Sequence, residues 1–422
     1  MRLEQTVAES AKAPPVRLPF RLFLSALAAA EKITPEKLLP DLTADALIKK
    51  AGVPVSPGAR QGLRQLTAAI AKDTELTMFG RLSLQWDFIR LMRNAAKVEQ
   101  ALSSNPAMRE APVVAPIFIL GLPRSGTTFL HGLLADDPDN LVPRAWQTIY
   151  PQPRRADFDS SADRRAKIVN RQFQFFGGIS PEFSQLHPID ADGPQECSEI
   201  TSHVFQSLRF DTTFRVPDYQ QWIDARGHEE AFLFHRKFLQ VLQHGAGGMG
   251  AAAHRWVLKC PDHSFCLDAI LKIYPDARFV VVHRDPLRVF ASVAHLTEVL
   301  RKPFLKNIDP LEIGAQVTER WIEGAQRLVE FDQRADLGPG RKIHIHYDEL
   351  AAAPLAAIAR IYAQFDLPFS AAAAKAIGEK LNAKPAGGYG GERRYVLDRF
   401  GINPQRLAPH FSTYLDYFQI SV

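Results

Sequence analysis

Residues 116–130, PIFILGLPRSGTTFL, constrain the fold of this chain more than any other segment. An apolar, β-branched run at 116–120 ends in a loop bounded by Gly121 and Gly126, and two threonines then begin a helical pattern. This order predicts a buried strand, a loop that cradles a phosphate group, and a helix N-terminus that favours negative charge. The spacing of the two glycines is that of a P-loop.

The position of the positive charge distinguishes this loop from that of an ordinary NTPase. Such proteins carry Lys directly after the second glycine, whereas this chain has Thr127 there and places its cation inside the loop, at Arg124. We therefore expect the loop to grip a phosphate group without ATP chemistry. For this loop taken alone, the alternative is a turn that binds nothing, because short motifs produce false matches.

A second strand, turn and helix is predicted at 278–292. The continuous apolar run 279–282 is typical of a strand buried on both faces. Arg284 follows at its carboxyl end, and Ser292 lies eight residues further on, in the next helical segment. A guanidinium offers phosphate two parallel hydrogen bonds, and a hydroxyl supplies a neutral donor beside it. A structural Arg–Asp pair is the alternative here, but two phosphate-binding patterns on one chain favour the phosphate interpretation of both.

With these two patterns the chain resembles the sulfotransferases that use 3′-phosphoadenosine 5′-phosphosulfate (PAPS) as donor. The similarity runs from about residue 116 to the C-terminus, and it looks closest to the large bacterial branch of the family. The resemblance implies that Arg284 and Ser292 bind the donor's 3′-phosphate, and that a C-terminal loop with Arg393 and Arg394 closes over it. The residues it assigns to the 5′-phosphosulfate are Arg124, Ser125, Gly126, Thr127 and Thr128.

The resemblance also implies a reaction, the in-line transfer of a sulfuryl group to a hydroxyl of a small or lipid-like acceptor, without a metal. Lys259 matches the family lysine that lies between the donor's bridging oxygen and the acceptor, where a compact ammonium suits a leaving group. The general base stays open between His263, close to Lys259 in sequence, and Glu196, in a segment that begins with His187. Gln147 stands where many relatives have a carboxylate, and an amide cannot take a proton.

The remaining segments are expected to support this site. From residue 116 strands and helices alternate, which indicates a P-loop-like α/β fold with a parallel central sheet flanked by helices and ligands at the carboxyl ends of its strands. Residues 1–110 are predicted to be a helical N-terminal extension, and 111–422 the sulfotransferase domain. Within that domain, the Phe-rich stretch 141–250 is expected to be mainly helical and to form the acceptor pocket. Residues 385–422 are expected to hold the donor-closing loop and tail.

Composition narrows the partners and the compartment. Of the 422 residues 46% are hydrophobic, which supports a large core, and the net charge of +5 comes without a long basic tract, so nucleic acid is not an expected ligand. The three cysteines have no metal-binding spacing, and no apolar segment is long enough to cross a bilayer. We expect a cytoplasmic protein without a metal site, whose helical extension offers a surface for a homodimer.

Three other functions fit parts of the sequence. A P-loop kinase or NTPase rests on the spacing of Gly121 and Gly126, and the missing Lys argues against it. A non-catalytic protein that binds PAPS, or its product adenosine 3′,5′-bisphosphate (PAP), would fit Gln147. A scaffold built on the helical N-terminus has little support beyond the absence of chemistry there.

Overall fold

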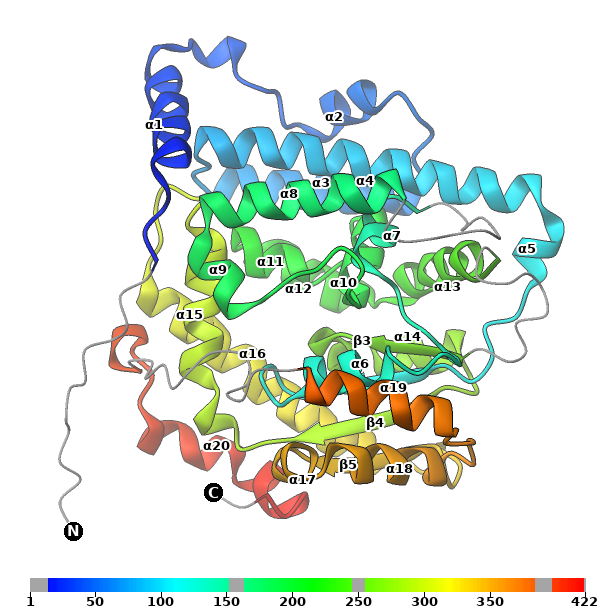
Figure 1. Ribbon diagram of the computed structural model, residues 1–422. Helices are drawn as coiled ribbons and strands as arrows, with labels where there is room; N and C mark the ends of the chain where they lie inside the picture. Colours follow the sequence, from blue (N-terminus) through cyan, green and yellow to red (C-terminus); the bar gives the residue numbers. More distant parts are fainter. Residues whose placement is uncertain (1–13, 152–162, 245–254, 384–396, 421–422) are drawn as a thin grey trace.

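The computed structural model describes residues 14–151, 163–244, 255–383 and 397–420 (Figure 1). At its centre is a five-stranded sheet in the order β2-β3-β1-β4-β5, in which neighbouring strands are parallel. The strands are β1 (Ile117–Leu120), β2 (Asn140–Leu141), β3 (Arg255–Lys259), β4 (Arg278–His283) and β5 (Lys342–His346). The parallel sheet expected from the sequence is confirmed.

Alternate residues of the central strands supply two separate cores, one on each face of the sheet. Ile119 and Val280 belong to an apolar cluster on one face, and Phe118 and Val281 belong to a larger cluster on the other. Because both faces are covered, these strands are continuous apolar runs rather than alternating ones. Helices of the first face are α6 (Thr127–Leu134), α17 (Tyr347–Ala352), α18 (Pro354–Gln364) and α19 (Ala371–Asn382). Helices of the second face include α14 (Leu267–Ile273), α16 (Pro310–Asp332) and α20 (Pro404–Tyr417).

The described residues that precede β1 are largely helical. They form α1 (Leu18–Ile33), η1 (Glu36–Leu38), α2 (Ala44–Ala51), α3 (Pro57–Asp73), α4 (Met78–Ser104) and α5 (Pro106–Glu110). The hydroxyls of Ser56 and Thr77 accept backbone hydrogen bonds and so cap α3 and α4. Apolar side chains of α2 to α5 join the larger of the two sheet cores, whereas α1 has no buried residue. A domain boundary near residue 110 stays a prediction.

A group of helices separates β2 from β3 in the chain. They are α7 (Ala145–Ile149), α8 (Arg164–Ile179), α9 (Pro181–Leu186), α10 (Cys197–Thr201), η2 (Ser202–Val204), α11 (Arg209–Phe214), α12 (Pro217–Arg226) and α13 (Glu229–His244). Figure 1 shows them between the sheet and the long helix α4, with α15 (Phe290–Arg301) beside them. The short helices η4 (Pro261–Phe265), η5 (Pro286–Arg288) and η6 (Asp398–Phe400) complete the described elements. None of the helices within the described ranges is both long and apolar enough to cross a bilayer.

Candidate active site

The loop between β1 and α6 has the backbone of an anion cradle. Arg124 and Gly126 both adopt left-handed conformations, with φ of 65° and 97°, and Gly126 is the N-cap of α6. Ser125 between them is 1% exposed, and its Oγ has no hydrogen-bond partner among the described residues. An unpaired buried hydroxyl costs free energy. A bound anion at the helix N-terminus would give it a partner.

At both glycines of the loop, atoms of neighbouring elements lie too close for a side chain. A Cβ at Gly121 would lie 2.5 Å from the carbonyl oxygen of Val282, and a Cβ at Gly126 would lie 2.7 Å from the ring of Tyr347. These distances are shorter than any side chain tolerates, so only glycine lets the loop pack against β4 and α17. The glycine spacing read from the sequence therefore has a packing cause as well as a binding one.

Arg284, directly after β4, reaches this loop. Its Nη1 donates a hydrogen bond to the carbonyl oxygen of Arg124 at 3.0 Å, and its guanidinium lies 3.9 Å from the ring centroid of Tyr347. The structure thus brings together the two arginines predicted from separate segments. Ser292, near the start of α15, is half-buried. In the described part of the chain no hydrogen bond joins Ser292 to Arg284, and Arg393 and Arg394 lie outside that part.

Lys259 and Glu196 form a buried ion pair beside the loop. The Lys259 side chain, at the end of β3, is 3% exposed; its Nζ donates to Thr128 Oγ1 at 3.1 Å and also pairs with the Glu196 carboxylate. Burial by itself would raise the pKa of Glu196, but the charge of Lys259 and its hydrogen bond to the carboxylate outweigh burial and hold that pKa below its ordinary value. Glu196 is therefore ionised at neutral pH.

His263 lies apart from this pair. Its ring is 2% exposed and packs edge-on against Phe118, with the ring centroids 5.1 Å apart, and a second ring, Phe232, lies 6.0 Å away. Burial lowers the pKa of His263 well below the usual range. Its neighbours Pro261 and Asp262 line the cavity described next, while the described lining does not include His263. The imidazole is held among core side chains rather than beside Lys259.

A cavity of about 370 Å³ opens beside the loop, with Arg124, Thr128 and Glu196 in its wall. Two further titratable residues, His187 and Asp262, also line it. Burial lowers the pKa of His187, which is therefore neutral at pH 7. Burial, followed by the charge of Glu196, raises the pKa of Asp262 to about 6. Sequence reasoning missed Asp262, although its position just after the Lys259 strand was a usable signal.

Gln147 stabilises the start of helix α7. Its Oε1 accepts a hydrogen bond from the backbone N–H of Arg144 at 3.1 Å and so caps α7. The residue is 4% exposed and lines a different cavity, together with Asn140 and Trp256. The amide at this position therefore does not face the Lys259–Glu196 pair.

A larger cavity of about 670 Å³ adjoins the first. Its wall is mostly apolar and comes chiefly from α1, α4, α8 and α11; examples are Phe23, Leu27, Phe79, Trp86, Phe173 and Phe176. The two cavities lie next to each other, because several residues belong to the walls of both. The shared residues are Ile189, Gln195, Glu199, Arg209, Thr213 and Leu300.

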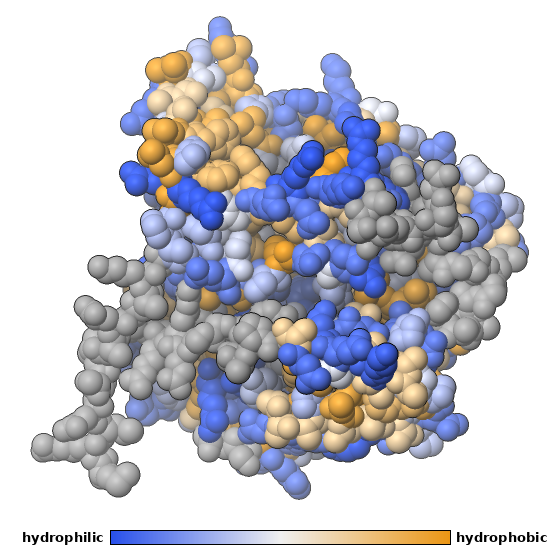
Figure 2. Space-filling model, in the orientation of Figure 1, coloured by the Kyte–Doolittle hydropathy of each residue, from blue (hydrophilic) through white to orange (hydrophobic). Residues whose placement is uncertain are grey.

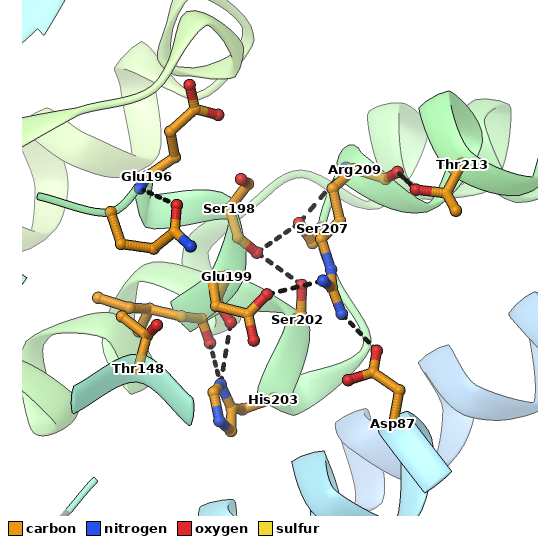
Figure 3. A network of polar contacts seen from close by, with 12 residues as sticks. Asp87, Thr148, Glu196, Ser198, Glu199, Ser202, His203, Ser207, Arg209 and Thr213 are labelled. Carbon is orange, nitrogen blue, oxygen red and sulfur yellow. Dashed lines mark hydrogen bonds and ion pairs between the residues drawn. The ribbon is translucent and has the colours of Figure 1, made fainter. Parts of the chain in front are cut away.

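Four charged side chains form a closed network where the cavities meet. Arg209 donates to Glu199 and to Asp87 at 2.7 Å each, and Arg90 donates to the same two carboxylates at 2.6 Å each. Figure 3 shows Arg209 reaching from α11 to Asp87 of α4, while Glu196 points away from the network. Burial would raise the pKa of Asp87, but the two guanidinium charges lower it to about 2. The network is thus charge-balanced and ionised.

A phosphate-type loop with an arginine inside it thus lies next to a buried lysine at the end of the neighbouring strand, as the sulfotransferase resemblance implies. A sequence profile of the sulfotransferase family matches residues 116–371, and the chain belongs to this family. Its fold is the P-loop-like sulfotransferase fold.

The chain is similar to several bacterial sulfotransferases. Omega-hydroxy-beta-dihydromenaquinone-9 sulfotransferase Stf3, from Mycobacterium bovis and Mycobacterium tuberculosis, is 24% identical over 260 residues, which are 60% of this chain and 63% of Stf3. The match therefore spans less than two thirds of these relatives. Sulfotransferase STF9 from Mycobacterium avium is 27% identical with a TM-score of 0.80, covering 90% of this chain and 98% of STF9. Sulfotransferase STF1 from Mycobacterium tuberculosis H37Rv is 26% identical with a TM-score of 0.76, covering 87% of this chain and 97% of STF1.

Proposed function

We propose that this protein transfers a sulfuryl group from PAPS to a hydroxyl group of a lipid-like acceptor, by in-line displacement without a metal. The observation that carries the proposal is the position of the Lys259–Glu196 pair. Lys259 bonds to Thr128, at the start of α6, and to Glu196, and these two residues line a cavity that adjoins a large apolar chamber. A charged donor and an apolar acceptor can thus meet at one lysine.

The residues of the loop fit a phosphosulfate group. The buried Ser125 hydroxyl lacks a partner among the described residues, and the N-cap of α6, Gly126, has no side chain to cap the helix. Arg124 supplies positive charge for this dianionic group. PAPS, when bound, supplies the activated sulfuryl group and a phosphate leaving group. Arg284, Ser292, Arg393 and Arg394 are proposed to bind its 3′-phosphate.

Lys259 is proposed to neutralise the charge that develops on the leaving oxygen. Its ammonium is fixed by Thr128 and Glu196 before any substrate arrives, so little reorganisation is needed during transfer. Because the side chain is almost fully buried, its charge acts in a medium of low dielectric, where it is worth more than in water.

Glu196 is proposed as the base that takes the acceptor's proton. It is ionised, it lines the donor cavity, and it touches the lysine that faces the leaving group. His187 is a second candidate, because burial keeps its ring neutral in the wall of the same cavity. Of the two bases that the sequence left open, the packing of His263 against Phe118 favours Glu196.

The apolar chamber is proposed to hold the hydrocarbon part of the acceptor. Its volume of about 670 Å³ suits a drug-sized or partial lipid chain. The Stf3 relatives are named for an omega-hydroxy dihydromenaquinone, an apolar molecule with a hydroxyl. We propose an acceptor of that chemical kind, an alcohol on a long apolar chain.

Calorimetric titration with PAP and with ATP, with and without Mg²⁺, tests the donor site. We expect micromolar or tighter binding of PAP and little binding of ATP. Arg284→Ala should weaken PAP binding roughly a hundredfold, since a bidentate guanidinium contact is lost. Arg406→Ala, an exposed arginine of α20, is the matched control and should leave the affinity unchanged. Mg-dependent binding of ATP in preference to PAP would overturn the proposal in favour of an atypical kinase.

A further inference from the structure

Helix α1 presents an apolar stripe to solvent. Its outward residues recur every three or four positions, and three of them are large: Leu18, Leu22 and Ile33, with exposed fractions of 62%, 61% and 83%. Ala26 and Ala29 continue the stripe between them. An exposed apolar stripe this long is unusual on a surface helix, whose outward face is ordinarily polar.

The charges of the same helix are segregated. Arg17, Arg21 and Lys32 are exposed along one edge of the stripe. The one acidic residue between 17 and 33, Glu31, faces the molecule, where it pairs with Lys306 at 2.5 Å and accepts a hydrogen bond from the N–H of Met78. The outward surface of α1 therefore combines apolar side chains with positive charge alone.

The inward side of α1 forms the rim of the apolar chamber. Phe23 and Leu27 line the chamber, and the rings of Phe20 and Phe23 each lie 5.7 Å from Phe175 of α8. Four of the apolar lining residues remain substantially exposed, Phe23 at 39%, Leu82 at 42%, Trp86 at 51% and Phe175 at 44%. The chamber thus opens beside α1, and Figure 2 shows hydrophobic surface gathered over this part of the molecule.

We propose that α1 and the chamber mouth dock on the surface of an anionic lipid bilayer, with the stripe of Leu18, Leu22 and Ile33 entering the acyl region. An amphipathic helix with a basic polar edge lies in the plane of such an interface, held by apolar burial and by attraction to anionic lipids. A second copy of the chain would present the same positive edge, and like charges oppose that pairing. The use of this surface, delivery of the acceptor from the bilayer to the chamber, rests on the proposed function; the docking itself does not.

Co-sedimentation with lipid vesicles tests the docking without donor or acceptor. The full chain should bind vesicles of phosphatidylcholine with phosphatidylglycerol, bind phosphatidylcholine alone more weakly, and be released by salt. Leu22→Glu should weaken partition to the mixed vesicles roughly tenfold, and Leu18→Glu with Ile33→Glu should weaken it further. Leu355→Glu replaces an exposed leucine of α18, on the opposite side of the sheet in Figure 1, and should have no effect.

Two results would overturn the docking surface. One is equal vesicle binding by Leu22→Glu and Leu355→Glu, or none by the wild type. The other is a dimer of the wild type in analytical ultracentrifugation that Leu22→Glu dissociates, since the stripe would then be a protein interface.

A second assay separates docking from catalysis: Leu22→Glu should transfer sulfuryl to a short water-soluble alcohol as the wild type does, but lose transfer to a hydroxylated lipid held in vesicles. Equal loss with both acceptors would contradict the inference.

Discussion

The two halves of the proposed active site, one for the donor and one for the acceptor, are built by different means. The donor half consists of short segments at the carboxyl ends of neighbouring parallel strands, and its main contacts involve backbone atoms, such as the hydrogen bond from Arg284 to the carbonyl of Arg124. The acceptor half consists of side chains from helices far apart in the chain, assembled around the charged network of Asp87 and Arg209. Anion recognition is thus local in the sequence, whereas the apolar chamber exists only after the helices have packed.

Replacement of the lysine between the two halves should have the largest effect. Lys259→Met keeps the length of the side chain but removes the charge, and we expect kcat to fall about a thousandfold, because a preorganised charge at the leaving group is lost. Steady-state kinetics with saturating donor measures this change. Lys272→Met, at an exposed ion pair with Glu229, should be neutral. A loss within tenfold would mean that the two halves do not meet at Lys259.

Removal of one member of the charged network should have the second-largest effect, a loss of folding stability. Asp87→Ala leaves Arg90 and Arg209 with fewer partners in a buried setting, and we expect the free energy of unfolding in urea to fall by about 3 kcal/mol. Asp45→Ala removes an exposed pair with Arg64 and should cost less than about 1 kcal/mol. Similar costs for the two variants would show that the network does not hold the acceptor half together.

Asp262 gives the donor cavity a pH-dependent stability. Folding raises the pKa of this carboxyl from 3.8 to about 6, so its favourable contribution is complete below the unfolded pKa and is lost as the pH rises through 6. Asp262→Asn stays neutral and should be more stable than the wild type at pH 8 by about 2 kcal/mol. Thermal unfolding across pH should show this gain shrinking to nothing near pH 4. If the gain in stability does not depend on pH, its cause is packing rather than the titration of Asp262.

A bulky residue where the two cavities adjoin should have the smallest effect of these substitutions. It tests whether acceptor binding can be changed without changing donor binding. Leu300 lines both cavities, so Leu300→Trp fills space where they adjoin. We expect kcat/KM for a long-chain alcohol to fall about tenfold, as shape misfit in an apolar pocket costs a few kcal/mol at most, with PAP affinity unchanged. Leu311→Trp, at a site 60% exposed, is the control. A weaker PAP affinity in Leu300→Trp would mean that the halves are not separable.

The strand–loop–helix units that form the proposed donor half could be predicted from the sequence, because their signals are local. The glycine spacing, Arg124 and Arg284 lie in strand–turn–helix units, whose parallel arrangement brings strand ends to one edge of the sheet. The pairing of Lys259 with Glu196 joins residues far apart in the chain. The family resemblance related each of them to the acceptor, but nothing in the sequence indicated that they pair. His263 shows the limit: its closeness to Lys259 in sequence does not tell on which side of the strand end its ring lies, and it packs on Phe118.

The acceptor half could not be predicted to the same degree. The aromatic residues of 141–250 were expected to form a pocket, but only packing decides which of them line it: Phe173 and Phe176 do, while Phe205 is fully buried in the core. The part played by α1 and α4 was not expected. Their residues Phe23 and Trp86 reach the chamber through tertiary contacts that no spacing reveals.

The most direct measurement is the transfer of radiolabelled sulfuryl from PAPS to two alcohols, one on a long isoprenoid or quinone chain and one short and water-soluble. Our account predicts Mg-independent transfer with a much higher kcat/KM for the long-chain alcohol, abolished in Lys259→Met. Tight PAP binding with no transfer to either alcohol, or a preference for the short one that Lys259→Met leaves intact, would contradict it.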